Sequence, residues 1–75
     1  EAYYAEFPLE ARPADRHEHG CAEFIYVMSG RLVVDVNGEE ITIDAGDAMH
    51  FDSSLPHSYR REGAVVCRAL VVVIP

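Results

Sequence analysis

The stretch from Arg16 to Gly30, RHEHGCAEFIYVMSG, constrains this chain most, because it places three metal-ligating side chains within seven residues and then becomes apolar. On an extended strand, side chains two residues apart share a face at a spacing of roughly 6.6 Å, so His17 and His19 can direct two imidazoles to one point. Glu23 has the same phase but would lie roughly 13 Å beyond His19 on a straight strand. We therefore expect a bend at Gly20 that returns Glu23 to the histidine pair.

A fourth ligand is expected from a distant part of the sequence. His57 is the best candidate, because Pro56 pre-sets the backbone before it and the strand Ser58–Arg61 follows. Three imidazoles and one carboxylate suit one divalent transition metal ion, such as Zn, Fe, Mn or Ni, rather than Ca or Mg. The predicted metal ligands are therefore His17, His19, Glu23 and His57.

Alternating apolar residues and turn signals predict an all-β fold. The strongest local signal is Asn37-Gly38 between two alternating runs, which predicts a hairpin with a type I′ turn. Residues 24–28 are apolar on both faces, which indicates a strand covered by layers on both sides. Residues 10–16 are polar and are expected to form a loop. The remaining expected strands are Ala2–Leu9, Ala48–Phe51, Ser58–Arg61 and Ala64–Ile74. Seven or eight strands without a helix favour a sandwich or barrel, and the double-sheet jelly roll suits this number.

The residues also resemble a known family. His17, His19, Glu23 and Gly30 fit the pattern HxHxxxExxxxxxG, which is similar to the first motif of the cupin superfamily. The second cupin motif is similar to the pattern formed here by Gly46-Asp47, Phe51, Pro56 and His57. More narrowly, EFIYVMSGRLVV and AGDAMHFDSSLPHSYRREG resemble the cupin domain that follows a helix-turn-helix in bacterial transcriptional regulators of the Xre type. The resemblance implies a double-stranded β-helix, that is, a jelly-roll cupin barrel, and a filled set of four metal-ligand positions.

Length and charge limit the function further. The 75 residues are expected to form one domain, 1–75, excised from a longer chain because it begins with Glu1 rather than Met. A core of this size is marginal, so a metal or a partner subunit would help, and we expect a homodimer. Thirteen acidic residues against six arginines and no lysine give a net charge of −7, which argues against nucleic-acid binding by this domain and excludes lysine Schiff-base chemistry. Only two cysteines and no apolar leader or span indicate a cytoplasmic protein without membrane contact.

Other side chains are candidates for binding a small ligand. Tyr26, Met28, Phe51 and Tyr59 are possible walls of a pocket inside the barrel mouth, although such residues on strands are more often plain core. Arg68 interrupts an apolar run and could pair with a ligand carboxylate. An arginine in such a position more often pairs with Asp or Glu at a strand edge, and the same applies to Arg31, Arg60 and Arg61.

Three further residues near the motifs have more ordinary interpretations. His50 lies out of phase with Met49 and Phe51 and is expected to be a surface residue or a hydrogen-bonded core residue rather than a ligand. Cys21 could approach the metal but is more simply a small buried residue. Catalytic residues are unknown, with Tyr59 and Glu39 as the possible general acids or bases.

Two functions agree with these features. The first is the effector-sensing domain of a bacterial transcriptional regulator, in which the metal helps to bind a small organic ligand such as a carboxylate. The alternative is a small stand-alone metal-dependent cupin enzyme, namely a dioxygenase, isomerase or decarboxylase. A cupin that keeps the ligand residues without binding metal strongly remains the simplest alternative to both.

Overall fold

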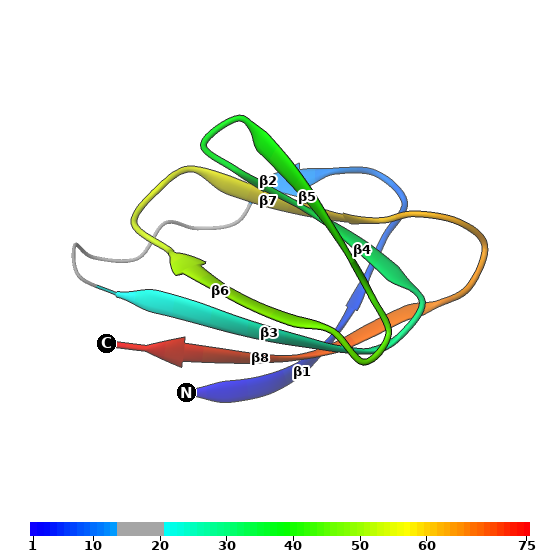
Figure 1. Cartoon of the computed structure of the whole chain (residues 1–75), viewed down its shortest axis with the longest axis horizontal. Coiled ribbons are helices and arrows are strands. Elements are labelled where there is room, and N and C mark those ends of the chain that lie inside the picture. The colour runs from blue at the N-terminus through cyan, green and yellow to red at the C-terminus, as the bar shows by residue number, and fades with distance from the viewer. Residues whose placement is uncertain (14–20) are drawn as a thin grey trace.

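The computed structural model describes residues 1–13 and 21–75 and contains eight strands and no helix in that part of the chain. Figure 1 shows the strands arranged in two layers that face each other. The strands are β1 (Ala2–Phe7), β2 (Arg12–Pro13), β3 (Ala22–Ser29), β4 (Arg31–Val36), β5 (Glu39–Asp44), β6 (Ala48–Asp52), β7 (His57–Arg61) and β8 (Cys67–Ile74). The predicted all-β jelly roll is thereby confirmed.

Each layer is a four-stranded sheet in which all neighbouring strands are antiparallel. One sheet has the order β1-β8-β3-β6 and the other the order β2-β7-β4-β5. The last strand, β8, therefore lies inside its sheet between β1 and β3. The amino group of Glu1 donates a hydrogen bond to the Val73 carbonyl at 3.0 Å, so the two ends of the chain lie side by side (Figure 1).

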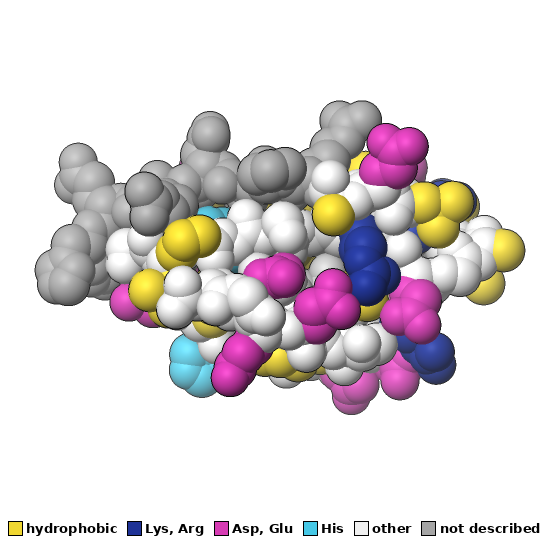
Figure 2. Space-filling view, turned by 90° about the horizontal axis from the view of Figure 1, so that it is seen from above, with side chains coloured by type: hydrophobic (Ala, Val, Ile, Leu, Met, Phe, Trp, Pro, Cys, Tyr) yellow, Lys and Arg dark blue, Asp and Glu magenta, His cyan; other side chains and the backbone are white. Residues whose placement is uncertain are grey.

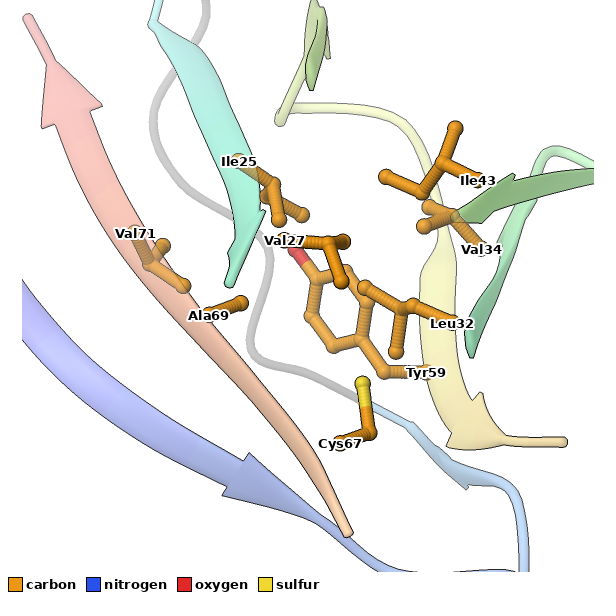
Figure 3. Packing of buried hydrophobic residues seen from close by; sticks show 9 residues of the cluster. All are labelled: Ile25, Val27, Leu32, Val34, Ile43, Tyr59, Cys67, Ala69 and Val71. Carbon is orange, nitrogen blue, oxygen red and sulfur yellow. The ribbon is translucent and has the colours of Figure 1, made fainter. Parts of the chain in front are cut away.

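The core lies between the two sheets and follows from the period-two alternation of the strands. Ile25 and Val27 of β3 point toward Leu32 and Val34 of β4, and all four side chains are fully buried (Figure 3). The removal of these apolar side chains from water provides the main stabilisation of the domain. The rest of the cluster consists of Ile43, Tyr59, Cys67, Ala69 and Val71.

The turns have the conformations that their sequences predict. Asn37 and Gly38 both have positive φ, 52° and 91°, as a type I′ turn requires, and the Gly38 amide donates to Oδ1 of Asp35 at 3.0 Å. In the next turn, Gly46 has φ 92° and the Asp44 amide donates to Oδ2 of Asp47 at 3.1 Å. The first turn fixes the register of β4 against β5, and the second leads the chain from β5 to β6 in the other sheet.

Three expectations about the strands were wrong in detail. The outer face of β3 is open to solvent, with Tyr26 39% and Met28 43% exposed, although two-sided coverage was predicted. Arg12–Pro13 forms the short strand β2 on the free edge of β7, where a loop was expected, because the β7 backbone offers hydrogen-bonding groups there. The last strand begins at Cys67 and not at Ala64, since Gly63 turns the chain with φ 92°.

The surface is charged on the side where β5 lies in Figure 1. Figure 2, which looks at the molecule from that side, shows acidic side chains spread among a few arginines. Among the described residues there is no helix that is long and apolar enough to cross a membrane.

Candidate metal centre

Glu23 is a carboxylate buried at one end of the barrel. It lies near the start of β3, where it pairs with Phe51 of β6 and Val73 of β8, and only 2% of it is exposed. The hydroxyl of Tyr59 donates a hydrogen bond to Oε1 of Glu23 from the opposite sheet. Burying a carboxylate is costly unless it is hydrogen-bonded or paired with positive charge, and the Tyr59 hydroxyl supplies one such hydrogen bond.

His57 faces Glu23 from the first position of β7. Its Nδ1 lies 2.8 Å from the Leu55 carbonyl oxygen, and a carbonyl can only accept, so Nδ1 carries the proton. In the neutral ring the lone pair is then on Nε2, which lies 3.7 Å from Oε2 of Glu23. This nitrogen is buried and has no hydrogen-bond partner among the described residues.

Aromatic rings enclose the histidine and the carboxylate. The centroid of the His57 ring lies 5.1 Å from that of Phe51 and 5.6 Å from that of Tyr59, both in edge-on arrangements. The Phe7 ring lies 5.2 Å from Tyr59 on its far side. These contacts hold the imidazole and the phenol in place and keep water from the carboxylate.

Tyr59 is held as a neutral hydrogen-bond donor. Burial raises the pKa of its phenol strongly, and the hydrogen bond to Glu23 and the negative charge of Glu23 raise it further. The same carboxylate contributes to a raised pKa of Tyr3, after the larger effect of burial. Tyr59 therefore positions Glu23 and leaves Oε2 directed toward His57.

The raised pKa of Tyr59 predicts a loss of stability at alkaline pH. The contribution is complete below the unfolded value of about 10 and decreases as pH rises toward the folded value, because the unfolded chain releases the proton first. Between about pH 10 and 11, we expect the free energy of unfolding of Tyr59→Phe to decrease less steeply than that of the wild type, by up to about 1.4 kcal/mol per pH unit. Urea unfolding across this range measures it, with Tyr26→Phe on the outer face as the control. Equal slopes for wild type and Tyr59→Phe would contradict the burial of this phenol.

The structure brings together two of the four predicted metal ligands, Glu23 and His57. The other two, His17 and His19, lie outside the described residues, as does the bend expected at Gly20, and no group of three or more potential ligands occurs in the described part of the chain. An unpartnered imidazole nitrogen next to a carboxylate oxygen fits a transition metal ion. The hydrogen bond at His57 Nδ1 has the form that commonly orients a metal-binding histidine.

The other predicted site residues divide between the interior and the outer surface. Phe51 and Tyr59 line the site around His57. Tyr26, Met28 and Arg68 lie on the outer face of their sheet, outside the barrel interior in which the pocket was expected, because Ile25 and Val27 have the inward phase of β3. Arg68 instead pairs with Glu6 at 3.3 Å.

Three polar or thiol side chains complete this comparison. His50 is exposed, as expected, and Cys21 is partly buried. Ser53 was not among the predicted site residues, yet it is fully buried in the loop after β6, and its hydroxyl has no hydrogen-bond partner among the described residues. Its amide donates to the Cys21 carbonyl at 3.3 Å, which places it near the start of β3, and loop composition gives no signal of such burial.

The chain is similar in sequence to curated regulator proteins. The HTH-type transcriptional regulator PuuR of Escherichia coli is 28% identical over 61 residues, which cover 81% of this chain and 33% of the regulator. The chain thus spans about a third of the length of the curated relatives it matches.

Two solved structures are similar to the whole fold. The Cupin_2 domain of an XRE family transcriptional regulator from Enterobacter cloacae has a TM-score of 0.79 at 20% identity and covers 99% of this chain and 96% of that chain. A predicted oxalate decarboxylase from Thermotoga maritima has a TM-score of 0.75 at 27% identity and covers 97% of this chain and 62% of that chain. The family model for the Cupin_2 cupin domain matches residues 4–73, and the chain therefore belongs to this family of cupin domains.

Proposed function

We propose that this domain binds one divalent transition metal ion at the Glu23 end of the barrel and uses it to hold a small organic ligand. The observation that carries the proposal is the Nε2 atom of His57, which is buried, unpartnered among the described residues and directed at Glu23. His17 and His19 complete the proposed ligand set. A buried nitrogen without a partner is unfavourable unless something else satisfies it.

The described side chains around this site have positioning roles. The Leu55 carbonyl fixes the tautomer of His57, and the Tyr59 hydroxyl holds one oxygen of Glu23. The rings of Phe51 and Tyr59 limit the access of water, so a bound carboxylate or carbonyl would sit in a poorly hydrated site. When bound, the metal supplies a Lewis-acidic position for such an oxygen.

The proposed role of this binding is effector sensing in a bacterial transcriptional regulator. The similarity to PuuR supports it, and DNA binding would belong to another part of the longer chain, since this domain has a net charge of −7. The proposal includes a cytoplasmic location without membrane contact.

A homodimer is part of the proposal and is supported by the outer face of the β1-β8-β3-β6 sheet. Tyr4, Leu70 and Tyr26 follow one another in register across three strands, and each is more than one third exposed. A contiguous apolar area of this kind marks an interaction surface.

The metal is tested by measuring the metal content of the untagged protein and of two histidine variants by mass spectrometry. We expect stoichiometric metal in the wild type and in His50→Ala, whose side chain is exposed on the outer face, and a loss of the metal in His57→Ala. Tyr59→Phe should weaken the metal affinity by about 10- to 100-fold, because Glu23 loses the group that orients it.

Two outcomes would contradict the metal proposal. Metal that persists in His57→Ala would show that it binds elsewhere. No metal in the wild type, even after refolding with Zn, Fe, Mn or Ni, would leave a metal-free ligand site that uses Glu23 and His57 as hydrogen-bonding groups.

A metal-dependent enzyme is the second candidate and is favoured by the similarity to the predicted oxalate decarboxylase. Turnover of small carboxylates by the metal-loaded domain, followed as CO₂ release or O₂ consumption, distinguishes the enzyme from the sensor.

A further inference from the structure

Arg61 lies at the opposite end of the barrel from Glu23 and His57. It shares the inward phase of β7 with His57 and Tyr59 and is the register partner of Leu32, which is fully buried. It lies four positions along the strand from His57, or about 13 Å. Its amide donates to the Pro8 carbonyl at 2.8 Å, which fixes it beside the end of β1. Arg61 is therefore remote from the proposed metal.

The charge of Arg61 is unbalanced. Arg31 pairs with Asp44 at 2.7 Å, Arg60 with Glu40 at 3.2 Å and Arg68 with Glu6 at 3.3 Å, all on the surface. The guanidinium of Arg61 makes no ion pair or side-chain hydrogen bond with any described residue, and its Nε is buried without a partner.

Arg61 does not lack a partner for want of acidic side chains, because the chain has 13 acidic residues and 6 arginines. A buried guanidinium donor without an acceptor is unfavourable, so its position requires an explanation.

A pocket opens beside this guanidinium. It has a volume of about 390 Å³ and is lined by Glu6, Phe7, Pro8, Arg61 and Val66. This volume is within the range of small-molecule sites. Three of the lining residues, Phe7, Pro8 and Val66, are apolar, and the guanidinium of Arg61 is an unpaired cation.

Glu6 adds a negative charge to the same pocket, although it is paired with Arg68. Repulsion by Glu6 disfavours an anion of charge −2 more than one of charge −1. The positive charge of Arg61 also reaches the buried thiol of Cys67, where it opposes the effect of burial, which raises the pKa of that thiol.

We propose that this pocket is a second binding site, for a small monocarboxylate with an apolar tail. The carboxylate accepts hydrogen bonds from the guanidinium of Arg61, for which the planar fork of arginine is well suited. The tail lies against Phe7, Pro8 and Val66. The site is independent of the metal centre and holds whether or not that centre binds an ion.

The test uses butanoate as the probe, with the domain stripped of metal so that no carboxylate is bound through a metal ion at the first site. Binding is measured by isothermal titration calorimetry and located by chemical-shift changes in NMR spectra. We expect binding to the wild type, with shifts at Phe7 and Val66, and a loss of affinity of about tenfold or more in Arg61→Met. Arg60→Met is the matched control, because Arg60 is adjacent but points outward to Glu40, and it should bind butanoate like the wild type.

Stability without ligand provides a second measurement. Arg61→Met removes an unpartnered buried donor while keeping an unbranched apolar stem of similar length to that of arginine, so the unliganded variant should unfold at the same or a higher urea concentration than the wild type. A clearly lower midpoint would show that Arg61 has a structural role and would overturn the proposal.

Three binding results would also overturn it. The first is the absence of butanoate binding by the wild type, and the second is equal binding by Arg61→Met. The third is tighter binding of inorganic phosphate than of butanoate, which would contradict the preference for a single negative charge that Glu6 imposes.

Discussion

Gly30→Ala is expected to lower the free energy of unfolding by about 2–5 kcal/mol, the sum of a left-handed backbone penalty and overpacking. Gly30 has φ 77°, and a Cβ there would lie 2.8 Å from the Val66 carbonyl oxygen and 2.9 Å from Cα of Cys67. Both contacts are with backbone atoms, which cannot rotate away as a side chain can. For a 75-residue domain, whose total stability is on the order of 4–11 kcal/mol, this loss is a large part of the whole.

Gly46→Ala is the control for the backbone conformation alone. Gly46 has φ 92°, but a Cβ there meets nothing within 4 Å. We expect it to cost only about 1–2 kcal/mol, and urea unfolding with an unchanged m-value measures the difference between the two variants. Equal losses would contradict the close approach of Gly30 to the chain before β8. If the difference is observed, the glycine that ends the pattern HxHxxxExxxxxxG is required by packing rather than by ligand chemistry.

Leu32→Ala is expected to destabilise the domain by about 2–5 kcal/mol, because it leaves a cavity between the two sheets. Leu32 is fully buried and is part of the cluster that both sheets share (Figure 3). The same substitution at Leu9, which is 54% exposed, should change stability by less than about 0.5 kcal/mol.

Urea unfolding of the metal-free protein compares the two leucine variants without a contribution from ligand binding. Similar losses at the two positions would contradict the placement of the core. The metal-free condition matters because an ion that binds only the folded domain would add to the stability of both variants.

Much of the fold could be predicted because its signals are local. Asn37-Gly38 between alternating runs specifies a hairpin in any context, and Gly46-Asp47 specifies the next turn. Which face of β3 is covered and which is exposed to solvent could not be predicted in the same way. Phe24, Tyr26 and Met28 are as apolar as their inward neighbours, so residue type does not show which face is covered.

The candidate site could be predicted only in part. Glu23 and His57 were predicted from strand phase, from the position after Pro56 and from the resemblance to a family pattern, and the structure brings their side chains together. The bond between Tyr59 and Glu23 joins residues 36 positions apart in sequence, and it depends on which strands face each other across the barrel. The same holds for Arg61, whose lack of a partner is a property of its surroundings and not of its neighbours in sequence.

The position of β8 has a kinetic consequence. Because β8 lies between β1 and β3, the sheet that carries Glu23 has a gap in its middle until residues 67–74 are in place. Until then β1 has no neighbour in its sheet. Its partner, β8, contributes residues that lie sixty or more positions further along the chain. Closing so long a loop costs entropy before any contact rewards it, so assembly of this barrel should be slow for its size and should proceed from the β4–β5 hairpin toward the paired ends. Until then, the exposed edges of β1 and β3 can pair with other chains.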